Sequence, residues 1–253
     1  MQQKQGNGFV EFVKNIFARV WALWGLLSFV ATFLIIFIPS MISYLIPEPK
    51  GQRFFIATAK VWMNVWLRLI GCPLTVKGKE HFENGKPYVI TCNHNTLMDV
   101  PITCPYIPGA NKTIAKKSFA KIPLFGWFYS KGSILVDRKS DASRRKSFED
   151  MKKTLANNMH MCIYPEGTRN RTADPLKQFY DGAFKLAIDT QTPVIPCLLF
   201  NTNTALPTNR FFYLMPQRLE MHFLPPVAVD NISTKELKEK VFRIMWDYYC
   251  SHQ

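Results

Sequence analysis

The stretch "YVITCNHNTLMDV" (residues 88–100) joins an apolar run to a cluster of polar side chains and then to the start of a new segment. Its first part, "YVITC", has the length and the β-branched content of a buried strand. His94 and Asp99 follow this strand closely. Polar side chains are expected there, because ligands bind outside the carboxyl ends of strands in open α/β sheets. The stretch therefore predicts a strand, a turn with functional side chains and a helix near 99–105.

Beyond Gly71, short apolar runs alternate with polar, helix-like segments. Strands are predicted at 74–78, 88–92, 112–116, 133–137, 160–164, 194–200 and 219–224. Helices are predicted near 99–105, 141–157, 181–190 and 233–249. The last helix begins with a capping signal, since Ser233 or Thr234 precedes Glu236. Strands separated by helices indicate an α/β fold with a mostly parallel mixed sheet flanked by helices.

An apolar segment precedes this region: Val20 to Ile46 contains no charged residue and is long enough to cross the hydrocarbon core of a bilayer. A cleaved signal peptide is excluded, because the run is too long, starts too late and lacks a small-residue cleavage site. A buried core helix is the alternative, although a helix apolar on every side is hard to cover with soluble protein. Pro39 and Ser40 interrupt the run. A spanning helix and a bent, half-inserted helix therefore both remain open, and we favour the second.

A second helix is predicted over 51–71, and it carries one narrow polar stripe made of Arg53, Lys60, Asn64 and Arg68. This pattern is typical of a helix lying in the plane of a membrane surface, and a core helix with a solvated edge is the alternative. We therefore interpret 1–70 as an N-terminal hydrophobic helical membrane-anchoring motif. Residues 71–253 are interpreted as the α/β domain.

The charge of the chain suits an anionic partner. Lys and Arg total 32 against 18 Asp and Glu, which gives a formal net charge of +14. Nucleic acid, phosphorylated metabolites and anionic lipid would all fit. Beside an apolar N-terminal region the charge favours the membrane lipid bilayer, and no nucleic-acid-binding pattern is evident.

The six cysteines are scattered, and no pair of them has metal-ligand spacing. We interpret them as buried thiols in a reducing compartment. Together with the apolar N-terminal region, this interpretation predicts a membrane location with the α/β domain on the cytoplasmic side. The pattern offers no site for a metal ion.

His94 and Asp99 form an H-x-x-x-x-D pattern just after the predicted strand. In a tight turn the carboxylate can reach one imidazole nitrogen and fix the tautomer, so that the other nitrogen acts as a general base. The chain contains no G-x-S-x-G sequence and no cysteine placed as a nucleophile. The base must therefore activate a hydroxyl or water that arrives with the substrate. An incidental histidine beside a capping aspartate also fits this spacing. We interpret the other histidines, which lack a carboxylate partner in a recognisable pattern, as structural or surface residues: His81, His160, His222 and His252.

Two further stretches place basic residues at strand ends. "KGSILVDRK" (131–139) supplies Arg138, and "CIYPEGTRNR" (162–171) supplies Glu166, Gly167, Thr168 and Arg169. Two guanidinium groups suit a bidentate grip on a phosphate, and a glycine lets the backbone approach closely. Each arginine by itself also fits a surface charge, but the ordered set favours a phosphate site.

The series "NHNTLMD", "GSILVDR", "YPEGTR" and "TPVIPC" resembles the four ordered motifs of the glycerolipid acyltransferase family, in particular the 1-acylglycerol-3-phosphate acyltransferases. The resemblance covers roughly residues 70 to 200. It implies that His94 is the general base and that Asp99 orients it. The remaining positions that it implies are contacts of the acceptor phosphate (Lys116, Arg138 and Arg169), residues that shape the site (Glu166, Gly167 and Thr168) and one on the acyl-chain side (Pro196).

The resemblance implies transfer of a fatty acyl group from acyl-CoA or acyl carrier protein to the sn-2 hydroxyl of lysophosphatidic acid, giving phosphatidic acid. It implies no cofactor and no metal. One position departs from the family, because Tyr180 in "FYDGAF" stands where relatives commonly have lysine, with Lys177 and Lys185 nearby. We expect the oxyanion donors to be backbone N–H groups near the His94 turn. The alternatives are acylation of another lysophospholipid, an amino-acid lipid or glycerol 3-phosphate, a non-enzymatic lipid-binding protein, and a metal-dependent hydrolase.

Overall fold

The structure is a computed structural model, and it describes residues 8–252. The strands are β1 Leu74–Lys77, β2 Val89–Cys92, β3 Asn111–Lys116, β4 Ser133–Val136, β5 His160–Ile163, β6 Val194–Phe200 and β7 Leu219–Phe223. The α-helices are α1 Gly8–Ile42, α2 Lys50–Leu69, α3 Asp99–Thr103, α4 Phe125–Lys131, α5 Asp141–Ala156, α6 Gly182–Asp189, α7 Thr202–Ala205 and α8 Thr234–Ser251. Short 3-10 helices cover Ser43–Leu45, Lys79–His81, Cys104–Tyr106 and Lys117–Lys121.

The strands form one sheet in the order β1-β7-β6-β2-β5-β3-β4. Neighbouring strands pair in parallel except β6 and β7, which are antiparallel, so the predicted mostly parallel mixed sheet is confirmed. Strands β2, β5, β3 and β4 are consecutive neighbours and run in the same direction. Their carboxyl ends therefore meet at one edge of the sheet, where the predicted site residues follow them.

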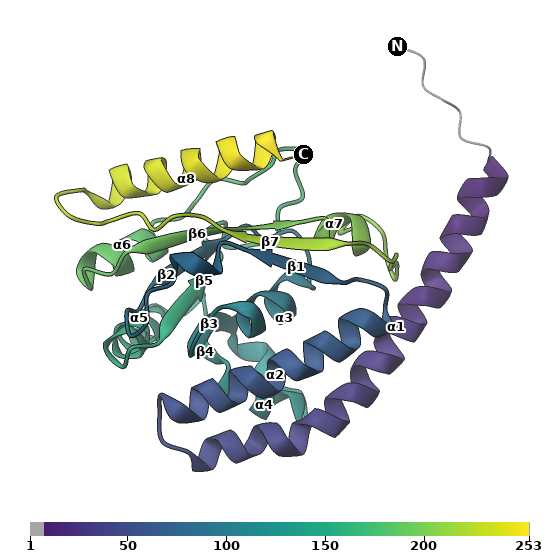
Figure 1. Cartoon of the computed structure of the whole chain (residues 1–253), viewed down its shortest axis with the longest axis horizontal. Helices are drawn as coiled ribbons and strands as arrows, with labels where there is room; N and C mark the ends of the chain where they lie inside the picture. The colour runs from purple at the N-terminus through teal and green to yellow at the C-terminus, as the bar shows by residue number, and fades with distance from the viewer. Residues whose placement is uncertain (1–7, 253) are drawn as a thin grey trace.

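Helices cover both faces of the sheet (Figure 1). On one face, α5 contacts β4 and β5, α6 contacts β2, and α8 contacts both β6 and α6. The predicted capping signal of α8 is confirmed, since the Ser233 side chain accepts from the Glu236 N–H and the Glu236 side chain accepts from the Ser233 N–H. On the other face lie α2, α3 and α4, with α1 outermost.

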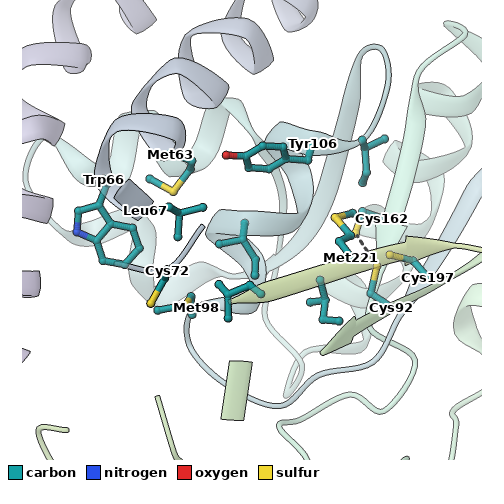
Figure 2. Close-up of a cluster of buried hydrophobic side chains, with 14 of the residues drawn as sticks. Met63, Trp66, Leu67, Cys72, Cys92, Met98, Tyr106, Cys162, Cys197 and Met221 are labelled. Carbon is teal, nitrogen blue, oxygen red and sulfur yellow. Dashed lines mark hydrogen bonds between the residues drawn. The ribbon is translucent and has the colours of Figure 1, made fainter. Parts of the chain in front are cut away.

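The core on the second face is shared between the sheet and α2 (Figure 2). Met63, Trp66 and Leu67 of α2 belong to the same buried cluster as Cys92 of β2 and Met221 of β7. Nine of the 20 residues of α2 are buried. Burial on this scale agrees with the alternative of a core helix with a polar edge. The boundary expected near residue 70 therefore separates two segments that share one core.

The α1–α2 hairpin is fixed to the rest of the molecule at its turn. Lys131 at the end of α4 is buried and donates to Glu48 Oε1 at 2.8 Å, and Tyr44 OH donates to the Trp127 carbonyl oxygen at 2.8 Å. Helix α1 continues through Pro39 as far as Ile42, so the proline does not end it. Its outer face stays exposed and apolar, with Phe9, Phe12, Ile16, Val20, Leu27 and Ile35 among the exposed side chains.

Candidate active site

The ends of four adjacent strands bring most of the predicted site residues to one cavity of about 810 Å³. His94 follows β2, Lys116 ends β3, Arg138 follows β4, and Gly167 and Thr168 follow β5. All five of these residues line the cavity. The parallel order of the strands therefore gathers residues that are up to 74 positions apart, from 94 to 168, in the sequence.

His94 and Asp99 are in contact, as the sequence predicts. His94 Nδ1 lies 2.9 Å from Asp99 Oδ2, and Asp99 is fully buried. The backbone N–H groups of Asn95 and Thr96 also donate to Oδ2, at 2.5 and 2.7 Å, while the Thr96 hydroxyl donates to Oδ1 at 3.1 Å. A carboxylate oxygen can only accept, so the tautomer that fits has the proton on Nδ1. Nε2 is then left unprotonated and available to a ligand in the cavity.

Two residues that the sequence analysis did not single out contact the turn that carries His94. The Asn93 side chain donates to the Leu199 carbonyl oxygen at 3.0 Å and accepts from the Leu199 N–H at 2.7 Å, which fixes the turn to β6. The Tyr164 ring packs against the His94 ring with centroids 4.5 Å apart. Burial raises the pKa of Tyr164 well above its usual value, so the ring stays neutral. The signal was present, because both residues stand inside the quoted motifs, beside His94 and Glu166.

Glu166 is buried beneath the turn and is absent from the cavity lining. Its carboxyl accepts from the His94 N–H at 2.8 Å and from the Lys177 N–H at 3.2 Å, so it ties two loops together. Its pKa is raised to about 7, chiefly by burial and also by the nearby charge of Asp99, while the two N–H bonds act in the opposite direction. This geometry makes Glu166 a positioning residue.

The backbone N–H groups of the catalytic turn are already engaged. Those of His94, Asn95 and Thr96 donate to the carboxyl groups of Glu166 and Asp99. The expectation that backbone N–H groups near the His94 turn stabilise the oxyanion is therefore wrong for these three positions. An N–H group that already donates to a carboxylate cannot also stabilise an oxyanion without breaking a buried hydrogen bond.

The loop after β5 approaches the cavity through Gly167, which has a φ of +69°. A Cβ atom added there would lie 2.8 Å from the ring of Tyr180, so the position needs glycine. The guanidinium of Arg138 donates to the Gly167 carbonyl oxygen. Lys177 Nζ donates to the Thr168 hydroxyl at 2.9 Å, which places this lysine beside the loop. Tyr180 lines the same cavity with an exposed ring, whereas Lys185 does not line it.

Arg169 and Pro196, like Asp99 and Glu166, lie outside the cavity lining. Arg169 is half-buried. Pro196 is buried in β6, and its carbonyl oxygen accepts from the Leu224 N–H at 2.9 Å. The phosphate contact of Arg169 and the acyl-chain role of Pro196 stay predictions.

Part of the cavity lining is apolar. It comes from side chains of α2 and α4, among them Phe55, Ile56, Trp62, Phe125 and Phe128. The same lining also includes the basic side chains of Lys116, Arg138 and Arg144. His94 contributes to the same lining. An apolar region and a basic region in one cavity fit an amphiphile with an anionic head group.

Two other histidines, His160 and His222, have surroundings that differ from each other. His160 is buried and its Nδ1 accepts from the Tyr88 N–H at 3.1 Å, and burial lowers its pKa to about 4. His222 has a carboxylate partner after all, since its Nε2 lies 2.7 Å from Glu220 Oε2. The sequence interpretation missed this pair because its spacing matches no known catalytic motif. His160 and His222 are outside the cavity lining.

Comparison with known proteins identifies the family. The model of the family described as Acyltransferase matches residues 73–199, which include β2, β5 and all the predicted site residues. The chain belongs to the acyltransferase family. The resemblance seen in the sequence motifs is thereby confirmed.

The chain also resembles individual acyltransferases, at sequence identities below 30%. The chain is 27% identical to the 1-acyl-sn-glycerol-3-phosphate acyltransferase of Saccharomyces cerevisiae over 72% of this chain and 60% of that protein. It is 29% identical to the protein of the same name from Cocos nucifera, over 71% of this chain and 57% of that protein. The chain thus spans about 60% of the length of these curated relatives.

The fold is that of a solved acyltransferase. The crystal structure of the 1-acyl-sn-glycerophosphate (LPA) acyltransferase PlsC from Thermotoga maritima superimposes with a TM-score of 0.79. The match covers 93% of this chain and 96% of that chain at 21% identity. The N-terminal helices are therefore part of a fold that the two proteins share over nearly their whole lengths.

Proposed function

We propose that this acyltransferase moves a fatty acyl group from acyl-CoA or acyl carrier protein to the sn-2 hydroxyl of lysophosphatidic acid, giving phosphatidic acid. The observation that carries the proposal is the 2.9 Å contact between Asp99 and His94, which lines a cavity with both apolar and basic side chains. The names of the relatives from Saccharomyces cerevisiae and Cocos nucifera support the choice of acceptor.

The chemistry follows from the tautomer of His94. Nε2 removes the proton of the acceptor hydroxyl while the hydroxyl oxygen attacks the thioester carbonyl carbon. The C–S bond of the resulting tetrahedral intermediate breaks, and the thiolate leaves with its electron pair and takes the proton back from Nε2. Asp99 stabilises the imidazolium that exists between these two transfers. No acyl-enzyme intermediate and no cofactor are needed in this scheme.

The acceptor phosphate would be held by basic side chains of the cavity lining. Arg138 is exposed and its guanidinium donates to the Gly167 carbonyl oxygen, and Lys116 is exposed at the end of the neighbouring strand. A phosphomonoester offers several oxygens to such groups, which favours lysophosphatidic acid over a neutral acceptor. The apolar side chains of α2 and α4 in the lining would contact an acyl chain.

We further propose that α1 lies along one leaflet of the bilayer. The segment Gly8–Leu45 is long and apolar enough to cross a membrane, and 22% of its most apolar window is buried. The α/β domain, however, contacts α1 near both ends. Leu214 donates its N–H to the Ala18 carbonyl oxygen at 3.2 Å, and the Trp127 ring stacks on Phe37 with centroids 6.2 Å apart.

Ala18 and Phe37 are 19 residues apart, or about 28 Å along a helix. This span is close to the full thickness of the hydrocarbon core, about 30 Å. A helix that crossed the bilayer would carry the contacting loops, with their exposed backbone groups, into hydrocarbon, where unsatisfied groups are costly. The in-plane arrangement avoids that cost and supports the proposed membrane association. The free cysteines support a cytoplasmic location of the domain.

A thioester-consumption assay with a panel of acceptors tests the reaction. Full-length protein in vesicles would receive either acyl-CoA or acyl carrier protein, together with lysophosphatidic acid, a neutral lysophospholipid, an amino-acid lipid or glycerol 3-phosphate. We expect product only with lysophosphatidic acid and identify the acylated position by mass spectrometry of the phosphatidic acid. Equal or faster turnover of another acceptor would overturn the assignment of the substrate. Thioester hydrolysis without acylated product would overturn the reaction type.

A further inference from the structure

The loop between α7 and β7 exposes two adjacent phenylalanines. Phe211 is 89% exposed, more than any other large apolar side chain among the described residues, and Phe212 is exposed beside it with a φ of +49°. Their ring centroids are 6.3 Å apart. Two neighbouring aromatic rings that face solvent require an explanation, since a single exposed apolar side chain is common but a contiguous apolar patch is not.

This loop is firmly attached to α1. Leu214 is buried, its N–H donates to the Ala18 carbonyl oxygen at 3.2 Å, and its side chain fills the space above Gly25. On the other side of the tip, the Arg19 guanidinium donates to the Phe211 carbonyl oxygen at 3.5 Å. The exposed rings therefore occupy a fixed place beside the N-terminal half of α1.

The exposed apolar side chains of the described residues lie almost entirely on one side of the molecule. They belong to the outer face of α1, to α2 and to the segment 119–127 that follows β3. Helices α5, α6 and α8, on the opposite face of the sheet, contribute no large exposed apolar side chain. Tyr44 and Leu45 lie in the 3-10 helix that follows α1, and Leu97 and Tyr180 line the cavity. The two phenylalanines thus continue the apolar surface of α1.

Basic groups surround the tip of the loop. Arg210 is exposed, and its guanidinium lies 4.9 Å from the ring centroid of Tyr213 and 3.5 Å from the Asn15 side chain. Arg19 and Lys14 are exposed on the adjacent turns of α1. Aromatic rings next to arginine and lysine are the composition of a membrane–water interface, where the rings enter the acyl boundary and the cations meet anionic head groups.

We propose that residues 208–213, the Phe211 loop, form a second contact with an anionic lipid bilayer. Phe211 and Phe212 enter the boundary between head groups and acyl chains, and Arg210 contacts lipid phosphate. The inference rests on the proposed in-plane placement of α1. A helix lying in a leaflet can still roll about its own axis, and a contact to one side of it removes that freedom. The loop would thereby fix the orientation of the cavity toward the membrane.

A fluorescent label at position 211 tests the contact without any assay of acyl transfer. The variant Phe211→Cys, in a chain that also carries Cys250→Ser, would be labelled with an environment-sensitive fluorophore and reconstituted in vesicles containing anionic lipid. Chain that retains Cys250, an exposed thiol on α8, would be labelled as the matched control. We expect lipid-borne nitroxides to quench the label at 211 strongly and the label at Cys250 hardly at all, with the reverse order for aqueous iodide.

Quenching of the 211 label by iodide alone would overturn the proposal. Protection from both quenchers would also overturn it, because a protein surface would then cover the loop.

Phe211→Ser supplies a second measurement, since a side chain this exposed contributes little to folding. Transfer of the variant between vesicles should be about tenfold faster than transfer of the wild type. Arg210→Ala should lose about fivefold in preference for anionic vesicles, and Lys153→Ala, on α5, should lose none. Acyl transfer to a water-soluble, short-chain acceptor should be unchanged in all three variants, which separates this contact from the chemistry.

Discussion

The His94 turn and the basic side chains of the cavity lining differ in burial. In the turn, Asp99 is fully buried and accepts four hydrogen bonds from His94, Asn95 and Thr96. Lys116 and Arg138 are exposed, and the guanidinium of Arg138 donates to the Gly167 carbonyl oxygen. In the proposed mechanism the base is thus held in one position, while the phosphate contacts come from exposed side chains. Substitutions in the turn should therefore act on rate, and substitutions of the basic side chains on affinity for the acceptor.

The largest effect should come from His94→Ala. The variant loses the general base, which contributes about 10²–10⁴-fold, and we expect the upper end of that range because orientation of the acceptor is lost as well. Fold and vesicle association should be unchanged, since the His94 side chain is held by Asp99 and Tyr164 without supporting either. Single-turnover acyl transfer measures the effect. Activity within a few fold of the wild type would remove His94 from the mechanism.

Asp99→Asn should be nearly as damaging, although His94 itself remains. An amide can donate to Nδ1, which leaves the proton on Nε2 and removes the base. We expect a loss of about 10²–10⁴-fold in kcat with little change in KM for the acceptor. Conversely, a variant that changed KM alone would show that Asp99 only supports the turn. Nitrogen NMR of the imidazole would report the tautomer directly.

Arg138→Ala should act on the acceptor at the exposed end of the cavity. Loss of one hydrogen bond to a charged group costs about 1.5–3 kcal/mol, or roughly 10- to 150-fold in kcat/KM for lysophosphatidic acid. KM for the acyl donor should hardly change. Arg169→Ala is the matched comparison, because Arg169 lies outside the cavity lining, and its effect should be smaller. A larger loss for Arg169→Ala than for Arg138→Ala would reverse the assignment of the phosphate contact.

The raised pKa of Glu166 should change how the free energy of unfolding depends on pH. Its folded-state pKa is raised to about 7 from a usual value of 4.5, because the side chain is buried. Between these two pH values the folded chain keeps a proton that the unfolded chain has lost. The free energy of unfolding should therefore fall by about 3 kcal/mol as pH rises from 4.5 to 7, and level off above pH 7.

Glu166→Gln is the control for this slope. His160, whose pKa is lowered to about 4 by burial, contributes in the opposite direction, since its stabilisation is lost as pH falls below about 6.5. The difference between wild type and variant in denaturant titrations cancels that contribution. Parallel curves for the two proteins across pH 4.5 to 7 would mean that Glu166 is ionised throughout.

The sequence predicted the sheet and the contact between His94 and Asp99, because both depend on local patterns. Every predicted strand is present within about two residues, and the His94–Asp99 spacing places both residues on one turn. The hydrogen-bond partners of Asn93 and Glu166 could not be predicted, since Leu199 and Lys177 come from other segments. Contacts between residues that are far apart in the sequence leave no local pattern. Local pattern also cannot tell which face of an apolar helix meets lipid and which meets protein.

That ambiguity was largest for the N-terminal helices. The polar stripe of α2 was interpreted as facing solvent at a membrane surface, yet Asn64 Oδ1 accepts from the Tyr106 hydroxyl at 2.6 Å. Lys60 Nζ lies 5.9 Å from the centroid of the same ring. Part of the stripe therefore serves the contact with the α/β domain. A polar stripe on a helix predicts only that polar groups lie opposite it, and these groups can belong to solvent, lipid or protein.

The buried cluster that α2 shares with the sheet has a consequence for how the chain matures. Trp66 and Leu67 complete the packing around Cys72 and Met98. A nascent chain whose first two helices have not yet reached a bilayer would therefore leave this layer open and expose apolar surface to chaperones and proteases. The proposed membrane contact of α1 would therefore link delivery to the membrane with completion of the core. We expect the cell to make this enzyme in its final location and to hold no folded, water-soluble reserve of it.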